Sequence, residues 1–246
     1  MTAALEPTRF FIVHMQKTAG TTLRDRFRHH YGEAAIYPNR TDGRDKRLSV
    51  ISLRHLLERW AARRDEIRVI AGHFPLCTVE LLDADFTTLT VMRPPVERTL
   101  SYLRHQRKLN RADQQRPLEA IYDDPFRFNG LIRNHMTRML SMTVDELRAT
   151  DSVLTDVSDT DERLQRAKDA LAGLDLFGLQ PRLEELCAEL TRRFGLDLGA
   201  PLHSNATEVA DAPEHLIARI ESDNALDVAL YEFASDLYGR RAAIEA

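Results

Sequence analysis

The chain has 246 residues, of which 43% are hydrophobic and 29% charged, and its net charge is −4. This composition is typical of an ordinary globular protein. No apolar run approaches the roughly 18–20 residues of a membrane-spanning helix, and residues 1–8 lack the pattern of a signal peptide. We therefore expect a cytoplasmic protein that has no membrane span and forms one domain over residues 1–246.

The charge is unevenly distributed along the chain. Residues 1–140 contain 24 Lys and Arg against 16 Asp and Glu, whereas residues 141–246 contain 10 against 22. The basic first half is therefore expected to handle anions, although solvated helix faces would give the same pattern. We expect no nucleic-acid partner, because the basic residues are not interleaved with aromatic ones and no nucleic-acid-binding motif is present.

Apolar periodicity predicts strands that alternate with helices. In chain order, the predicted strands cover about residues 9–14, 67–71, 87–92 and 176–179. The predicted helices cover about residues 21–31, 53–60, 95–108, 129–140, 160–172, 182–194 and 226–237. The longest predicted loops are 109–128 and 199–213. This alternation predicts an α/β fold that is P-loop-like, with three layers and a central parallel sheet flanked by helices.

The two cysteines form no metal or redox motif and suit a reducing compartment. Cys187 belongs to a helical apolar stripe and is predicted to lie in the core. Cys77 has no such stripe and is a weak candidate for a place near a site. No cluster of His, Cys and Asp has the spacing of metal ligands, so no metal is expected.

The segment after the first predicted strand is the first candidate site. Residues 13–22 read V-H-M-Q-K-T-A-G-T-T, which brings a cation, backbone N–H groups and a helix N-terminus together. Lys17 can reach an anionic oxygen, while Thr21 and Thr22 offer hydroxyls and suit the N-cap. The Lys precedes the Gly, unlike in the common nucleotide-binding loop. The segment predicts a phosphate site, and the alternative is a plain turn capped by Thr.

Two further strands end in polar residues at the same predicted edge of the sheet. Arg93 follows the strand at 87–92, and Ser101 lies in the helix that Pro95 begins, so the two can bind a second phosphate. An ion pair for Arg93 and an ordinary helix position for Ser101 are the alternatives. His73 follows the strand at 67–71 and can act as a general base on a hydroxyl, or it is an ordinary core or surface histidine.

These motifs resemble those of the PAPS-dependent carbohydrate sulfotransferases, and most closely the heparan sulfate 6-O-sulfotransferase group and its bacterial relatives. Residues 14–22 are similar to that group's H-x-Q-K-T-G-G-T-T, with Ala19 in place of a Gly. Residues 92–101 are similar to L-R-D-P-V-x-R-x-L-S, with Pro94 in place of the Asp. Further matches are residues 133–140, 177–179 and 224–231, so that the resemblance covers about residues 9–237.

The resemblance implies a sulfotransferase that moves a sulfuryl group from PAPS (3′-phosphoadenosine 5′-phosphosulfate) directly to a hydroxyl, with PAP (adenosine 3′,5′-bisphosphate) as product and no metal. The implied cofactor-binding residues are Lys17, Thr18, Ala19, Gly20, Thr21 and Thr22 at the 5′-phosphosulfate, with Arg93 and Ser101 at the 3′-phosphate. Lys17 and His73 are the implied catalytic residues, and the segment 199–207 is expected to cover the nucleotide. The resemblance and the missing anchor together lead us to expect a bacterial enzyme.

Two other functions remain open, namely a P-loop-like nucleotide-dependent kinase and a non-catalytic glycan-binding module. The acceptor is expected to be a saccharide or glycoconjugate, although a lipid-linked sugar, a small glycoside or a natural-product hydroxyl also fits. One group of basic residues could hold an acidic saccharide. The same residues could equally be ordinary exposed charges on the surface. These residues are the loop at 40–47 together with Arg104, Arg107, Lys108 and Arg111.

Overall fold

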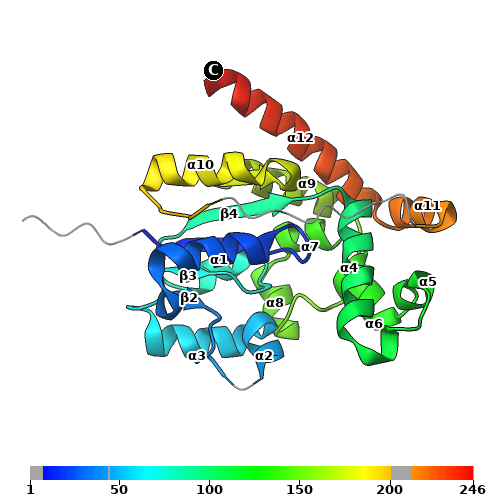
Figure 1. Cartoon of the computed structure of the whole chain (residues 1–246), viewed down its shortest axis with the longest axis horizontal. Helices are drawn as coiled ribbons and strands as arrows, with labels where there is room; N and C mark the ends of the chain where they lie inside the picture. The colour runs from blue at the N-terminus through cyan, green and yellow to red at the C-terminus, as the bar shows by residue number, and fades with distance from the viewer. Residues whose placement is uncertain (1–7, 44, 201–211, 246) are drawn as a thin grey trace, which may run out of the picture.

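The computed structural model describes residues 8–43, 45–200 and 212–245 (Figure 1). The five strands are β1 (Phe10–Val13), β2 (Ile36–Tyr37), β3 (Val69–Ile70), β4 (Thr87–Met92) and β5 (Leu176–Leu179). They form one parallel sheet in the order β2-β3-β1-β4-β5. The predicted three-layer α/β fold is therefore confirmed, and only the two-residue strand β2 was not foreseen.

Some of the α-helices coincide with a strong apolar periodicity in the sequence. Others are too short for a period to be recognised. They are α1 (Gly20–Tyr31), α2 (Lys46–Ile51), α3 (Leu53–Arg63), α4 (Pro95–Leu109), α5 (Leu118–Tyr122), α6 (Pro125–Arg127), α7 (His135–Ser141), α8 (Val144–Thr150), α9 (Asp161–Gly173), α10 (Leu183–Phe194), α11 (Glu214–Asp223) and α12 (Ala225–Glu245). The predicted loop at 109–128 is wrong in part, because α5 and α6 lie in it. None of the described helices has the length and apolar character needed to cross a membrane.

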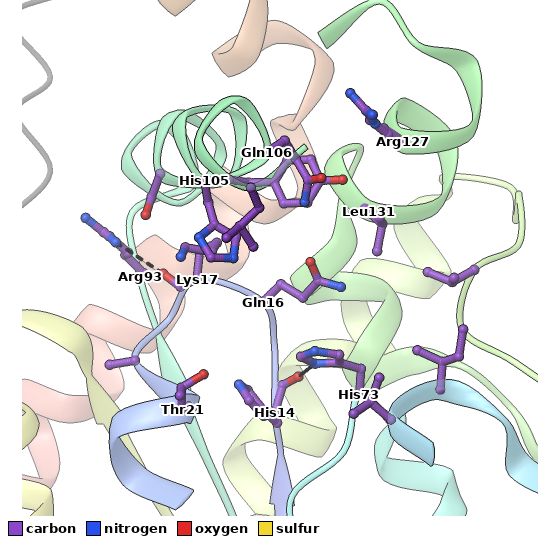
Figure 2. A pocket seen from close by; sticks show the side chains of 18 of the residues that line it. His14, Gln16, Lys17, Thr21, His73, Arg93, His105, Gln106, Arg127 and Leu131 are labelled. Atoms are coloured by element: carbon purple, nitrogen blue, oxygen red, sulfur yellow. Dashed lines mark hydrogen bonds between the residues drawn. The ribbon is translucent and has the colours of Figure 1, made fainter. Parts of the chain in front are cut away.

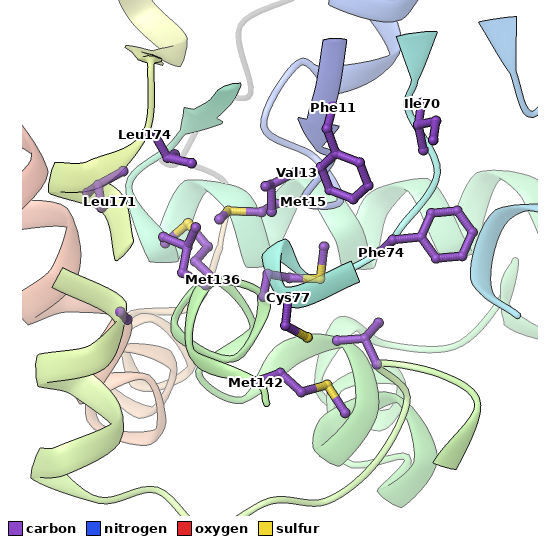
Figure 3. Packing of buried hydrophobic residues seen from close by; sticks show 14 of the residues in the cluster. Phe11, Val13, Met15, Ile70, Phe74, Cys77, Met136, Met142, Leu171 and Leu174 are labelled. Carbon is purple, nitrogen blue, oxygen red and sulfur yellow. The ribbon is translucent and has the colours of Figure 1, made fainter. Parts of the chain in front are cut away.

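Side chains alternate between the two faces of the sheet and bury each face under helices. Phe10 and Ile12 on β1 pack with residues of α1 and α10, whereas Phe11 and Val13 pack with α3, α7, α9 and α12. Figure 3 shows the second of these layers, which also includes Met136 of α7 and Leu171 of α9. The buried layers hold the sheet rigid, so the loops at its carboxyl edge are presented from a fixed frame.

The predicted helix at 129–140 is wrong in part. Its second half is the helix α7, but the chain breaks before it at Asn134, which adopts a left-handed conformation with φ 45°. The side chain of Asn134 accepts hydrogen bonds from the backbone N–H groups of Leu226 and Asp227 at the start of α12 (3.1 and 3.2 Å). The carboxylate of Asp227 in turn accepts from the N–H groups of Met136 and Thr137 in α7 (3.1 and 2.7 Å). The two helix N-termini therefore cap each other.

Before this break, residues Phe128–Ile132 form the π-helical turn η4. Two buried arginines satisfy carbonyl groups at its end. Arg98 of α4 donates to the carbonyls of Leu131 and Ile132 at 3.2 and 2.8 Å, and Arg138 of α7 donates to that of Gly130 at 3.2 Å. Since buried carbonyls need partners, Arg98 fixes η4 against α4.

Candidate functional site

A cavity of about 1060 Å³ opens at the carboxyl edge of the sheet, between the segments that follow β1, β3 and β4 and the helix α4 (Figure 2). All of the predicted site residues except Thr18 line it. These are Lys17, Ala19, Gly20, Thr21, Thr22, His73, Arg93 and Ser101. The structure thus brings together residues from three strand ends and from helix α4 that lie up to 84 positions apart in the sequence.

The strand order explains why these residues meet. β1 and β4 are neighbours, but the chain leaves β1 towards β2 on one side and leaves β4 towards β5 on the other. The loops after these two strands therefore diverge and leave a crevice, which is where open parallel sheets bind ligands. Lys17 follows β1 and Arg93 follows β4, so both lie at this crevice.

The loop after β1 has an unusual backbone. Lys17 and Ala19 both have positive φ, at 69° and 73°. The side chain of Thr18 points away from the cavity, because its hydroxyl is buried and donates to the carbonyl of Met15 at 3.0 Å. Thr18 can therefore offer a ligand only its backbone N–H.

Helix α1 begins at Gly20 with Ala19 as its N-cap, and no described side chain caps it. The expected capping by Thr21 and Thr22 is wrong, because both residues already lie in the first helical turn. The first N–H groups of a helix have no partner within it, and here they open on the cavity. An uncapped helix N-terminus beside a Lys has the geometry and charge that suit an anion.

Two cations lie together beside this helix end. Arg93 is buried, and its Nη1 donates to the carbonyl of Lys17 at 3.2 Å while Glu97 lies 3.4 Å away. Burial lowers the pKa of Lys17, and the charge of Arg93 lowers it further. Burial also lowers the pKa of Arg93, against the effect of Glu97. A bound anion would offset this unfavourable burial of like charges.

His73 lies across the cavity from Arg93, and its ring is held in one orientation (Figure 2). Its Nδ1 is 2.8 Å from the carbonyl of His14. Because a carbonyl only accepts, Nδ1 carries the proton and Nε2 of the neutral ring is free to accept one. Burial lowers the pKa of His73, which favours this neutral form.

His14 was present in the quoted motif but was not predicted as a site residue. Its Nδ1 donates to the carbonyl of Ala71 at 2.9 Å, and its ring centre is 4.6 Å from that of His73. Burial lowers the pKa of His14 to about 3, with a further contribution from His73. The cavity floor therefore carries two neutral imidazoles.

Sequence reasoning also missed cavity residues on α4 and α6. His105 and Gln106 line the cavity from α4, one helical turn after Ser101 and Tyr102. The four-residue spacing of Ser101 and His105 could have indicated this face. Arg127 of α6 also lines the cavity and pairs with buried Asp113 at 2.7 Å, and no local pattern indicates it.

The cations that were suggested for an acidic acceptor, and whose side chains the structure describes, lie outside the cavity. They are Arg40, Arg104, Arg107, Lys108 and Arg111. The segment 199–207 was expected to cover a nucleotide, and residues 201–207 of it lie outside the described residues.

Both cysteines are buried in the core, as predicted for Cys187, and Cys77 does not line the cavity.

Within the described ranges, no group of three His, Cys, Asp or Glu side chains is placed to hold a metal ion. No protein-family model matches the chain, and no curated protein is significantly similar to it. The fold and the geometry of this cavity are therefore the features that point to a function.

Proposed function

We propose that the protein is a sulfotransferase that moves a sulfuryl group from PAPS to a hydroxyl. One observation carries the proposal. Lys17, the uncapped start of α1 and Arg93 form a cationic end of the cavity, and a neutral histidine with a free Nε2 lies across the same cavity. An anionic donor and a hydroxyl acceptor need these two environments side by side.

The donor would occupy the cationic end. The N–H groups at the start of α1 and the ammonium of Lys17 suit the 5′-phosphosulfate, and Arg93 with Ser101 suits the 3′-phosphate. Lys17 and the N–H groups would also stabilise the charge that grows on the leaving phosphate as the S–O bond breaks. Preorganised donors of this kind supply most of the catalysis in related phosphoryl transfers.

The acceptor would be activated at His73. Nε2 takes the proton of the hydroxyl while its oxygen attacks sulfur in line, so that one O–S bond forms and the S–O bond to the phosphate breaks. The products are a sulfate ester and PAP. The proton on Nδ1 stays bonded to the carbonyl of His14, which keeps the ring oriented throughout.

A cytoplasmic location and a bacterial source belong to the same proposal. Both cysteines are free and buried, which suits a reducing compartment.

A P-loop-like kinase is the second candidate, because the parallel sheet and the loop after β1 also suit ATP. It is less well supported, since Asp124 is the one carboxylate among the described lining residues and a kinase needs acidic ligands for Mg²⁺. A glycan-binding module would need neither the uncapped helix end nor a free histidine nitrogen.

Calorimetry tests the donor site. We expect PAP to bind tightly and ATP with Mg²⁺ weakly. Lys17→Ala and Arg93→Ala should each weaken PAP binding at least tenfold, while Arg107→Ala, an exposed change on α4, serves as the control. Preferential binding of ATP with Mg²⁺ would favour the kinase.

Transfer of labelled sulfate from PAPS to a panel of acceptors tests the reaction itself. His73→Ala should lower kcat by about 10²–10⁴-fold while PAP still binds, since a general base contributes this much. A loss smaller than tenfold would show that His73 is not the base. Donor binding without transfer to any acceptor would favour the binding module.

A further inference from the structure

The wall of the cavity beside His73 is mixed, because Gln16 and His14 line it and the end of α2 adds apolar side chains. The backbone N–H of His73 donates to the carbonyl of Val50 at 2.6 Å, which holds the end of α2 against the histidine. Val50 and Ile51 both line the cavity and are half-buried. They belong to none of the three hydrophobic clusters that the described residues form, so their apolar surface is available to a ligand.

A second apolar group completes this end of the cavity. Leu131 of η4 and Leu154 both line it, and a Cβ added at Gly130 would lie 3.6 Å from the Cα of Leu154. Figure 2 shows Leu131 on the same side of the cavity as His73, with Arg93 and Thr21 on the other side. The cavity therefore has a cationic end and an apolar end, and the free Nε2 of His73 belongs to the apolar end.

The rim of the cavity also carries apolar side chains, next to the polar residues Asn110 and Asp124. Leu109 at the end of α4 and Phe126 of α6 line the cavity and are 67% and 63% exposed. Together with Leu48 of α2 they are the large apolar side chains that the described part of the chain leaves exposed. Exposed apolar groups gathered at a cavity mouth are typical of a ligand-binding rim.

The charges on the apolar side do not suit an acidic saccharide. Apart from Lys17 and Arg93, Arg127 is the cation that lines the described cavity, and it already pairs with Asp113. Asp124, which also lines the cavity, adds negative charge there. With the donor bound at Lys17 and Arg93, an anionic acceptor would meet repulsion from this carboxylate and would find no unpaired cation.

We propose that the acceptor is an alcohol or phenol carried on an apolar skeleton. This inference rests on the proposed function. The hydroxyl lies at Nε2 of His73 and the skeleton packs against Val50, Ile51 and Leu131, with its far end at Phe126. The acceptor oxygen bonds to sulfur, its proton passes to His73, and PAP leaves with the electrons of the broken S–O bond.

The test measures acceptor binding to the complex of the protein with PAP. Calorimetry compares 4-alkylphenols of increasing chain length with a disaccharide that contains a uronic acid. We expect the alkylphenol affinity to rise up to about fourfold for each added methylene, the value for a fully buried CH₂. Phe126→Ser and Ile51→Thr should flatten this dependence, whereas Leu48→Ser, a change at another exposed apolar residue that does not line the cavity, should leave it unchanged.

The measurements distinguish a failure of the proposed function from a failure of the proposed acceptor class. If PAP itself does not bind, the proposed function fails. If PAP binds but the disaccharide binds better than the alkylphenols, or if the alkylphenol affinity does not depend on chain length, only the proposed acceptor class is overturned. Because Phe126 is largely exposed, Phe126→Ser will not unfold the protein, and an unchanged chain-length dependence in that variant counts against the proposal.

Discussion

The imidazole of His14 fills the space that a side chain at Gly20 would need. A Cβ on residue 20 would lie 2.0 Å from Cδ2 and 2.4 Å from Nε2 of His14, far inside contact distance. His14 closes the cavity floor at the end of β1, and Gly20 begins α1. The glycine therefore allows the start of the helix to approach the histidine, which is what brings its N–H groups to the cavity.

Gly20→Ala should lower the free energy of unfolding by about 1–3 kcal/mol, because the ring or the loop must move. Urea denaturation at pH 7 measures the change. In the background of His14→Ala the same substitution should cost less, since the clash is removed. Gly173→Ala in α9, where no atom lies within 4 Å, is the control and should be slightly stabilising. Equal costs in the two backgrounds would contradict the clash.

Ala19→Gly should stabilise the protein by about 0.5–1 kcal/mol. The backbone of Ala19 is left-handed, a conformation that costs an L residue roughly 1–2 kcal/mol. Glycine avoids most of this strain, but part of the gain is lost because glycine makes the unfolded chain more flexible. Ala61→Gly in α3 is the matched control and should destabilise by about 1 kcal/mol, because the backbone there is helical. Thermal or urea denaturation measures the two changes in unfolding free energy. If both substitutions change it in the same direction, the backbone of Ala19 is not strained.

Asp227→Ala should cost about 2–4 kcal/mol, because it leaves the buried N–H groups of Met136 and Thr137 without an acceptor. Asp227→Asn should cost less, since its amide oxygen can still accept from Thr137. Asp236→Ala, an exposed change on the same helix, should stay within about 0.5 kcal/mol. A similar cost for Asp227→Ala and Asp236→Ala in urea denaturation would contradict the reciprocal caps.

The same caps explain why one helix was predicted wrongly. Residues 129–140 have helical periodicity, but Asn134 leaves the helical conformation to cap α12 about 90 residues later. Local periodicity cannot reveal such a partner. α2, α5 and α6 span fewer than two turns and were missed because a period cannot be read from so few residues. The residues at three strand ends could be predicted because parallel strands bring their carboxyl ends to one edge.

The rest of the cavity could not be predicted for a related reason. Arg127 reaches it through α6, whose placement depends on a buried ion pair with Asp113. His14 directly follows the buried residues of β1, so its sequence context indicates burial rather than a place at the cavity. Both positions depend on packing between segments that are distant in the sequence.

Stability should fall with acid in a way that depends on His14. In the unfolded chain its imidazole takes a proton below about pH 6.5, whereas burial keeps it neutral in the folded protein until about pH 3 because its pKa is lowered to about 3. The unfolded state therefore binds the extra proton between these values. Stability is lost as the pH falls through this window, by up to about 1.4 kcal/mol per pH unit.

His14→Asn removes this titration and keeps a donor for the carbonyl of Ala71. The slope of the unfolding free energy between pH 6.5 and pH 4.5, measured with urea, should become shallower. It should not vanish, because burial also lowers the pKa of His73 and of His135. An unchanged slope would show that His14 is protonated in the folded protein.

The proposed reaction should have its acid limb below pH 6.5. His73 acts as a base only when neutral, and burial lowers its pKa. The logarithm of kcat/KM should therefore be flat through neutral pH and decline with unit slope only in more acidic solution. Because the pKa of Lys17 is also lowered, activity should decline on the alkaline side before the ordinary lysine value. An acid limb centred above pH 6.5 would argue against His73.

Helix α4 sets the distance between the two ends of the cavity. It carries Ser101 at the cationic end and Leu109 at the rim, eight residues and therefore about 12 Å further along its axis. Inserting or deleting one residue between them would turn one end by about 100° and remove it from the cavity. Substitutions along α4 can therefore change the lining of the cavity, whereas a change in the length of α4 would separate its two ends.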